Sequence, residues 1–185
     1  MTQTSEQLLD GAFEQFRTHG FAKTSMSDIA KAAGVSRTAL YNHFDTKEAV
    51  FRALSERINA EATQAVVDAA RKTADWPTRL RDVMHARCRW VYDLLHEGAF
   101  GRELIDEKNR ICGGRALAAN DRFHALLSDI LHAGGLDERK AETFAGVLIN
   151  AVNGVLEAAE TRETAEAEVE LLMATLAQGI EAAEA

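Results

Sequence analysis

Three polar side chains within one short segment have the chemistry needed to recognise nucleic-acid bases. Arg37, Thr38 and Asn42 are spaced so that a helix would carry them on one outer face. In the major groove a guanidinium pairs with guanine, an amide pairs with adenine, and a hydroxyl bonds to several base edges. We therefore predict base contacts by these three residues, with Arg37 as the principal one.

Neighbouring side chains suit the DNA backbone instead. Tyr41, His43 and Lys47 carry groups that can reach phosphates, and Thr24 lies beside a predicted helix N-terminus, where free amides favour anions. The alternative is that all of these are ordinary solvated residues on a structural three-helix unit. The outer and inner positions match helical spacing over about twenty residues, which favours the DNA-binding interpretation.

Two short helices joined by a tight turn would position these side chains. Ser25 and Asp28 form a capping box at the start of the first helix. Gly34 permits a left-handed turn, and Ser36 caps the second helix, which we expect to run to about residue 44. The residues expected to point inward are Met26, Ile29, Ala33, Val35, Leu40 and Phe44. This arrangement is a helix-turn-helix.

Helices are predicted for the rest of the chain as well. One spans 4–19, capped by Thr4 and ended by Gly20, and another runs from an Asp45 cap to about Lys72. Apolar residues at helical spacing predict five more helices, over 78–96, 99–111, 116–133, 138–160 (capped by Asp137) and 164–182. We expect an all-α fold, with a DNA-binding domain over 1–47 and a helical ligand-binding and dimerisation domain over 48–185.

Composition supports an all-helical protein and limits its function. The chain has 185 residues, 46% of them hydrophobic, with a single proline and a net charge of −8. Residues 1–50 carry a net charge of only −1, so DNA binding would be local and would not resemble that of a basic coat protein. Two cysteines make no disulfide framework, and neither a signal peptide nor a membrane span is expected. A cytoplasmic, reduced protein follows.

Candidate ligand and dimer contacts come from the predicted C-terminal helices. A small-molecule cavity is mostly apolar with a few polar groups, although apolar helical stripes are as often plain core. The cavity candidates are Met84, His85, Cys88, Tyr92, Phe100, Leu104, Phe123, His124 and Leu127. Small residues four apart allow close helix packing, either within the monomer or in a dimer, which we favour. The dimer candidates are Gly146, Asn150, Asn153, Gly154, Val169, Leu172, Met173, Leu176 and Ile180.

Catalytic and metal chemistry is weakly indicated. His85 and Cys88 are three residues apart and could supply two metal ligands, but no further ligand has convincing spacing. Cys88 or Cys112 could sense redox state, yet each is more simply a small apolar filler. The charged run from Arg102 to Glu107 is more typical of a solvated helix face than of acid–base catalysis. We expect no metal, no cofactor and no enzyme activity.

The segment around the helix-turn-helix resembles the TetR family of bacterial transcription regulators, over roughly residues 5–55. The resemblance rests on Gly20-Phe21, Thr24, Ile29-Ala30, Ala33-Gly34-Val35-Ser36, Leu40-Tyr41, His43-Phe44 and Lys47-Glu48. It implies a homodimer built from the last two helices of each subunit, and a helical domain with a small-molecule cavity. One departure is Thr38, where the family often has glycine, so the operator sequence does not transfer from a relative.

The resulting hypothesis is a dimeric repressor. It would bind a near-palindromic double-stranded DNA operator and be released by an unknown small-molecule effector. The alternatives are an activator or global regulator with the same fold, and a metal, haem or thiol-based sensor on the same helices. An enzyme or a pure interaction module is a third possibility.

Overall fold

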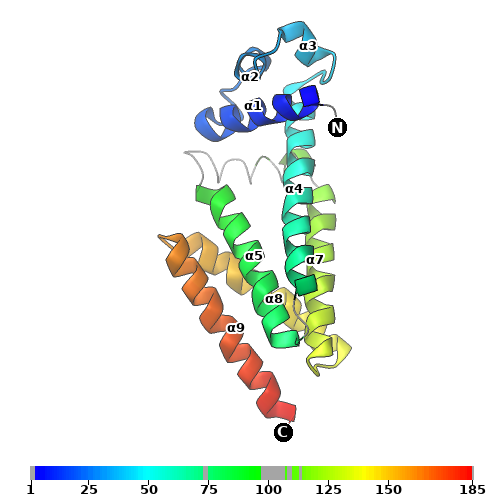
Figure 1. Cartoon of the computed structure of the whole chain (residues 1–185), viewed down its shortest axis with the longest axis vertical. Helices are drawn as coiled ribbons and strands as arrows, with labels where there is room; N and C mark the ends of the chain where they lie inside the picture. The colour runs from blue at the N-terminus through cyan, green and yellow to red at the C-terminus, as the bar shows by residue number, and fades with distance from the viewer. Residues whose placement is uncertain (1–2, 73–74, 97–106, 108–109, 113, 185) are drawn as a thin grey trace. The chain divides into compact units, whose positions relative to one another are not determined.

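The computed structural model describes residues 3–72, 75–96, 107, 110–112 and 114–184. These residues form helices joined by turns and contain no strand, which confirms the all-α prediction (Figure 1). The helices are α1 (Gln3–His19), α2 (Met26–Ala32), α3 (Arg37–Tyr41), α4 (Lys47–Lys72), α5 (Trp76–His96), α7 (Gly114–Ala133), α8 (Glu138–Ala158) and α9 (Arg162–Glu184). None of these helices is long and apolar enough to cross a bilayer.

The chain forms two compact units that do not follow the predicted boundary at residue 47. The N-terminal unit comprises Met1–Ala60 and Leu94–Leu117, and the C-terminal unit comprises Glu61–Asp93 and Ala118–Ala185. Helix α4 is unbroken and supplies residues to both units. The functional domain boundary therefore remains a prediction, because the compact units describe packing and not activity.

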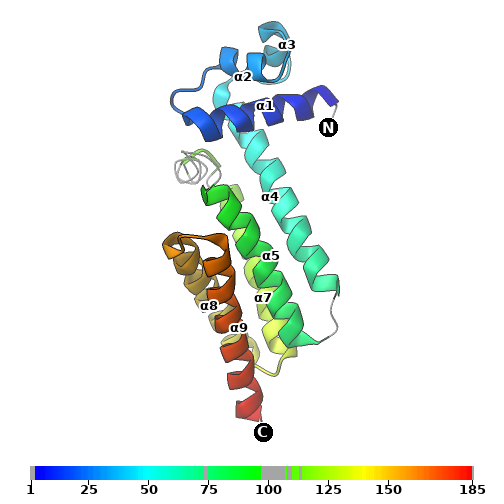
Figure 2. The same cartoon turned by 60° about the vertical axis from the view of Figure 1, so that its left-hand side comes forward.

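The N-terminal unit is built on one apolar core. Helix α2 packs against both α1 and α3 (Figures 1 and 2). The rings of Phe16, Phe21 and Phe51 meet at its centre, with centroids 5.1–5.5 Å apart, the spacing at which tilted and edge-to-face ring pairs are favourable. Ile111 and Cys112 also pack against this core. Tight packing of this kind gives α2 and α3 a fixed base.

Most of the predicted caps and turns are present. Ser25 and Asp28 form the capping box, Ser36 accepts the Ala39 N–H, and Asp137 accepts the Lys140 N–H. Gly20 and Gly34 adopt φ values of +79° and +67°, a region that side chains with a Cβ avoid. Local chemistry was sufficient to predict these positions.

Two predicted caps are wrong. Thr4 lies inside α1, which begins at Gln3. Helix α4 begins at Lys47, and its N-terminus is capped by Thr46, whose Oγ1 accepts the Ala49 N–H at 3.1 Å. Asp45 therefore lies one residue too early to be the cap, although its side chain is equally suited to the role.

The C-terminal unit contains most of α5 and α7 together with α8 and α9. Helices α8 and α9 pack against each other (Figure 2). Its interior is lined by apolar side chains from all four helices, including Leu80, Val83, Leu131, Leu148 and Leu156. Polar contacts join α5 to α9, since His85 bonds to Glu170 at 2.7 Å and Asp93 pairs with Arg162.

Candidate nucleic-acid interface

Helix α3 presents one polar face to solvent and anchors the other in the core. The side chains of Arg37, Thr38, Tyr41 and Asn42 are exposed, whereas Leu40 is fully buried. The Arg37 guanidinium lies 5.5 Å from the centroid of the Tyr41 ring, close enough for a cation–π contact. The predicted base-contacting residues thus lie together on the exposed face of a short helix that is held from behind.

The turn that precedes α3 sets the direction of this face. Gly34 takes the left-handed conformation, and the N–H of Val35 donates to the Ala30 carbonyl at 3.0 Å. Ser36 then starts the new helix with its hydroxyl oxygen 3.1 Å from the Ala39 nitrogen. These contacts form the predicted helix-turn-helix geometry.

Thr24 has an internal role instead of the predicted phosphate contact. Its side chain is only 3% exposed, and its hydroxyl donates to the Gly20 carbonyl at 2.8 Å, with the Gln15 carbonyl at 3.3 Å. The hydroxyl therefore ties the segment before α2 to the end of α1. A buried hydroxyl that already has partners is poorly placed to reach a phosphate.

Lys47 also differs from its prediction. Its ammonium donates to the carbonyls of Phe21 and Thr24, at 2.7 and 2.8 Å, and lies 4.4 Å from the Phe21 ring centroid. His43, by contrast, is exposed as expected for a phosphate contact. No sequence pattern indicated the Lys47 contacts, because they join residues more than twenty positions apart.

The predicted effector residues lie mostly in the packed interior of the C-terminal unit. Met84, Cys88 and Leu127 are fully buried, Phe123 and Tyr92 nearly so, and His124 partly. The Tyr92 hydroxyl donates to the Glu160 carbonyl at 3.2 Å. The predicted residues Phe100 and Leu104 lie outside the described residues. The structure thus shows these side chains as core and leaves their ligand contacts a proposal.

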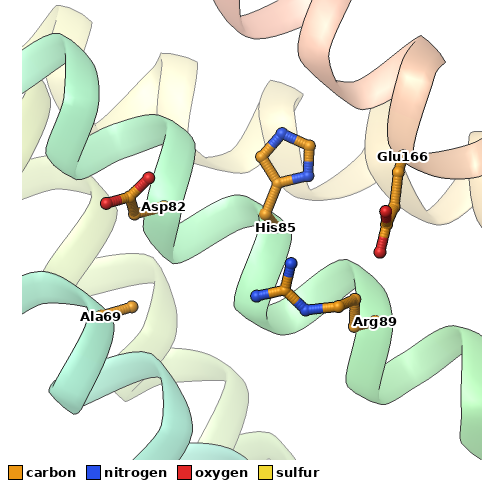
Figure 3. Close-up of a pocket in the computed structure, with 5 residues that line it drawn as sticks. All are labelled: Ala69, Asp82, His85, Arg89 and Glu166. Atoms are coloured by element: carbon orange, nitrogen blue, oxygen red, sulfur yellow. The ribbon is translucent and has the colours of Figure 1, made fainter.

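A polar pocket of about 340 Å³ lies on another side of α5 (Figure 3). Asp82, His85 and Arg89 come from α5, Glu166 from α9 and Ala69 from α4. Of these, only His85 was among the predicted effector residues. The pocket has charges of both signs and differs from the apolar cavity that the sequence predicted.

An arginine that sequence reasoning missed is half-buried in the C-terminal unit. The Arg87 guanidinium lies 4.3 Å from the Phe123 ring centroid, and its Nη2 donates weakly to the Asn120 amide oxygen at 3.5 Å. Burial lowers the pKa of Arg87 from its ordinary value, although the side chain stays charged at any physiological pH. The sequence signal that could have identified Arg87 as a candidate site residue is a charged side chain among the apolar residues of this helix.

The predicted dimer residues separate into two groups. Asn150, Asn153 and Gly154 on α8 are exposed, and Gly146 is partly exposed, as a dimer contact requires. Val169, Met173 and Ile180 on α9 are buried within the single chain, and Leu172 and Leu176 are intermediate. The first three α9 residues are therefore internal core, contrary to the prediction.

Exposed apolar side chains on the same two helices were missed. Val147 is 55% exposed, Leu171 is 69% exposed, and Phe144 is also exposed. Phe144 and Val147 each lie next to a buried position, and Leu171 lies between the buried Val169 and Met173, so the apolar pattern alone did not mark them as exposed. Exposed apolar side chains therefore lie on both helices of this pair.

Metal and thiol chemistry gains no support from the geometry. Among the described residues, no three His, Cys, Asp or Glu side chains are grouped to hold a metal. Burial raises the pKa of the Cys88 thiol to about 11, so the reactive thiolate is scarce at neutral pH. In the charged run, Glu107 pairs with Arg110 at 2.5 Å, and residues 102–106 lie outside the described part.

Comparisons with known proteins agree with this architecture. Residues 8–54 match the family described as bacterial regulatory proteins, tetR family. The transcriptional activator FasR of Mycolicibacterium smegmatis is 33% identical over 105 residues, which cover 57% of this chain and 46% of FasR. The probable acrEF/envCD operon repressor of Escherichia coli is 45% identical over 49 residues, 26% of this chain and 22% of that protein. The chain thus spans less than half the length of these two relatives.

Longer matches cover both units. The transcriptional regulator TtgR of Pseudomonas putida is 27% identical over 180 residues, covering 83% of this chain and 79% of TtgR. A TetR-like regulator from Rhodococcus sp. RHA1 has the same fold, with a TM-score of 0.73 at 22% identity over 92% of this chain and 93% of that one. Residues 8–54 thus form a helix-turn-helix domain of the TetR family, and the longer relative and the shared fold extend this similarity over most of the chain.

Proposed function

We propose that this protein is a transcriptional repressor that binds operator DNA as a homodimer and carries out no catalytic step. The observation that carries the proposal is the polar outer face of α3, opposite the buried Leu40 and within the segment that matches the TetR family. The protein would act in the cytoplasm, where two such helices would enter successive major grooves of a near-palindromic operator. Base contacts are assigned to Arg37, Thr38 and Asn42, and phosphate contacts to Tyr41 and His43.

Dimerisation would use the exposed surface of α8 and α9. Val147 and Leu171 leave apolar area in water that a second copy of the chain would cover. A Cβ placed on Gly154 would meet no atom of the described residues within 4 Å, so this glycine leaves room for a close approach by a partner helix. Tight DNA binding would need the two DNA-binding domains of a dimer, because the net charge of the N-terminal residues offers little general attraction to DNA.

The effector would bind in the C-terminal unit and favour a state of the dimer that does not fit DNA. The proposed contacts are the predicted residues around Met84 and Phe123, which would have to move apart to admit a ligand. Arg87 lies against Phe123 and offers a guanidinium to an acidic effector. Release requires that the effector bind this state more tightly than the DNA-bound one.

A mobility-shift titration tests the function. Fragments from upstream of the protein's own coding region would be titrated with purified protein at several salt concentrations, and a co-purified small molecule would be sought by native mass spectrometry. We expect selective, salt-sensitive binding to at least one fragment. Absence of selective binding to any genomic fragment would refute the proposal.

One variant pair tests the role of α3. Arg37→Ala should cost about 1–3 kcal/mol of operator affinity and relax base preference at one position of each half-site. Arg52→Ala is the matched control, because it removes the same charge from an exposed site on α4. An unchanged base preference in Arg37→Ala would show that another residue makes the contact.

A further inference from the structure

The ammonium of Lys47 is held by the backbone on the far side of the helix-turn-helix. It donates to the carbonyl oxygens of Phe21 at 2.7 Å and Thr24 at 2.8 Å, with the Ala22 oxygen at 3.4 Å. These carbonyls belong to the segment between α1 and α2, whereas Lys47 is the first residue of α4. The contacts therefore join the chain just before α2 to the chain just after α3.

Lys47 therefore holds together the two ends of the segment that contains the helix-turn-helix. Residues 25–46 contain α2, the turn at Gly34 and α3, and they lie between the two ends that Lys47 connects. A contact between the ends of a segment restricts every conformation in which they separate. Lys47 therefore adds to the Gly34 turn and the buried Leu40 in fixing the direction of α3 relative to α4.

The Lys47 ammonium has little capacity left for another anion. It carries three N–H donors, and three carbonyl oxygens lie within reach of them. The Phe21 ring adds a cation–π contact at 4.4 Å. That ring is itself fixed, because it packs against Phe16 and Phe51 in the core. A phosphate would have to displace contacts that hold the motif together.

We propose that Lys47 is a positioning residue for DNA recognition, which holds the helix-turn-helix closed and leaves the phosphate contacts to other side chains. The DNA part of this inference rests on the proposed function. The closure itself is a property of the free protein. The two can therefore be tested separately.

The first experiment measures amide hydrogen exchange in the free, full-length protein. Lys47→Met keeps the length of the side chain and removes its charge and donors. We expect exchange in α2 and α3 to accelerate about tenfold or more, the scale set by losing hydrogen bonds to a charged group. Lys23→Met is the matched control, because Lys23 lies in the same connecting segment with an exposed side chain, and it should leave exchange unchanged. Equal exchange in Lys47→Met and the wild type would overturn the proposal.

The second experiment measures operator affinity against salt concentration, at a temperature where circular dichroism shows each variant folded. We expect Lys47→Met to lose about tenfold in affinity and to discriminate operator from random DNA less well, with the wild-type salt slope. Lys47→Arg should recover part of the loss, since it keeps a charge and several donors but not the compact geometry of an ammonium. If Lys47→Met does not fold, Lys47→Gln, which also removes the charge, provides the same comparison.

A change in the salt slope decides against the proposal. Loss of a phosphate contact lowers the slope by about 0.9 for each contact, so any such decrease in Lys47→Met would identify Lys47 as a phosphate ligand. If the wild type binds no DNA selectively, the proposed function fails, while the exchange experiment still decides whether Lys47 closes the motif.

Discussion

Replacing Gly11 by alanine should destabilise the N-terminal unit, although alanine is the better helix former. Gly11 lies within α1, beside Ala33, the residue that ends α2. A Cβ at this position would lie 2.7 Å from the Ala33 nitrogen and 2.9 Å from both the Cα and the Cβ of Ala33. Favourable carbon contacts lie at about 3.5–4.0 Å, so one of the two helices must move.

Two opposing effects determine the magnitude. Helix propensity favours Gly11→Ala by about 1 kcal/mol. Overpacking costs about 1–3 kcal/mol, and the upper part of that range applies because two of the three atoms met are backbone atoms beside the Gly34 turn. We expect a net loss of about 1–2 kcal/mol from these two terms.

Chemical denaturation followed by circular dichroism measures this loss. The control is Gly179→Ala in α9, where a Cβ would meet no atom within 4 Å in the part of the chain that the structure describes, and helix propensity alone predicts a gain of up to about 1 kcal/mol. If Gly11→Ala were as stable as the wild type or more so, the close approach of α1 and α2 would not constrain the unit as argued.

Three further changes have expected outcomes. Asp28→Ala should lower the thermal midpoint at pH 7, and by progressively less as pH falls below the ordinary Asp range. Hydrogen bonds from the Ser25 hydroxyl and backbone lower the pKa of Asp28, so its stabilisation is present above the ordinary Asp range and is lost as pH falls through the lowered pKa. A pH-independent difference in thermal midpoint would exclude this cause. Leu171→Glu should change the sedimenting species from dimer to monomer while the protein keeps its helicity. Val169→Glu should instead unfold the C-terminal unit, because Val169 is fully buried. If both variants unfolded, Leu171 would have a core role and not a dimer contact. Gly34→Ala should lower the free energy of unfolding by about 1–2 kcal/mol, because Gly34 has a left-handed backbone conformation, although the space around it is open. Gly34→Asn should lower it by less, since asparagine tolerates this conformation better. Equal stability of both variants and the wild type in chemical denaturation would show that the positive φ imposes no cost.

Sequence alone was sufficient where a short segment determines its own structure. The Ser25–Asp28 box, the Ser36 cap and the left-handed turn at Gly34 depend on neighbours within a few residues. The choice between Asp45 and Thr46 as the cap of α4 was not decidable in this way, because both side chains suit the role and packing of the helix decides where it begins.

Contacts distant in sequence were beyond such reasoning. Thr24 and Lys47 are polar residues in a DNA-binding segment, and only the fold shows that their groups bond to the carbonyls of Gly20 and Phe21. The close approach of Gly11 to α2 left no pattern in the chain at all.

The α9 helix shows a second limit. A stripe of apolar residues predicts that a face is covered, but not whether the same chain or a second copy covers it. Val169 and Met173 proved to be covered by the same chain, while Leu171 was left in water. Composition could not separate these cases, because all three side chains are apolar and lie within two turns.

The brevity of α3 has a consequence for how faithfully it can recognise a base sequence. A helix of five residues has no stability of its own, so its order comes from its surroundings: Leu40 beneath it, its capped start and the Lys47 contacts that join the ends of the motif. Base contacts need fixed geometry, whereas phosphate contacts tolerate displacement. On warming, discrimination between sites should therefore decline before total affinity does, which makes the thermal limit of accurate regulation lower than the melting temperature of the protein.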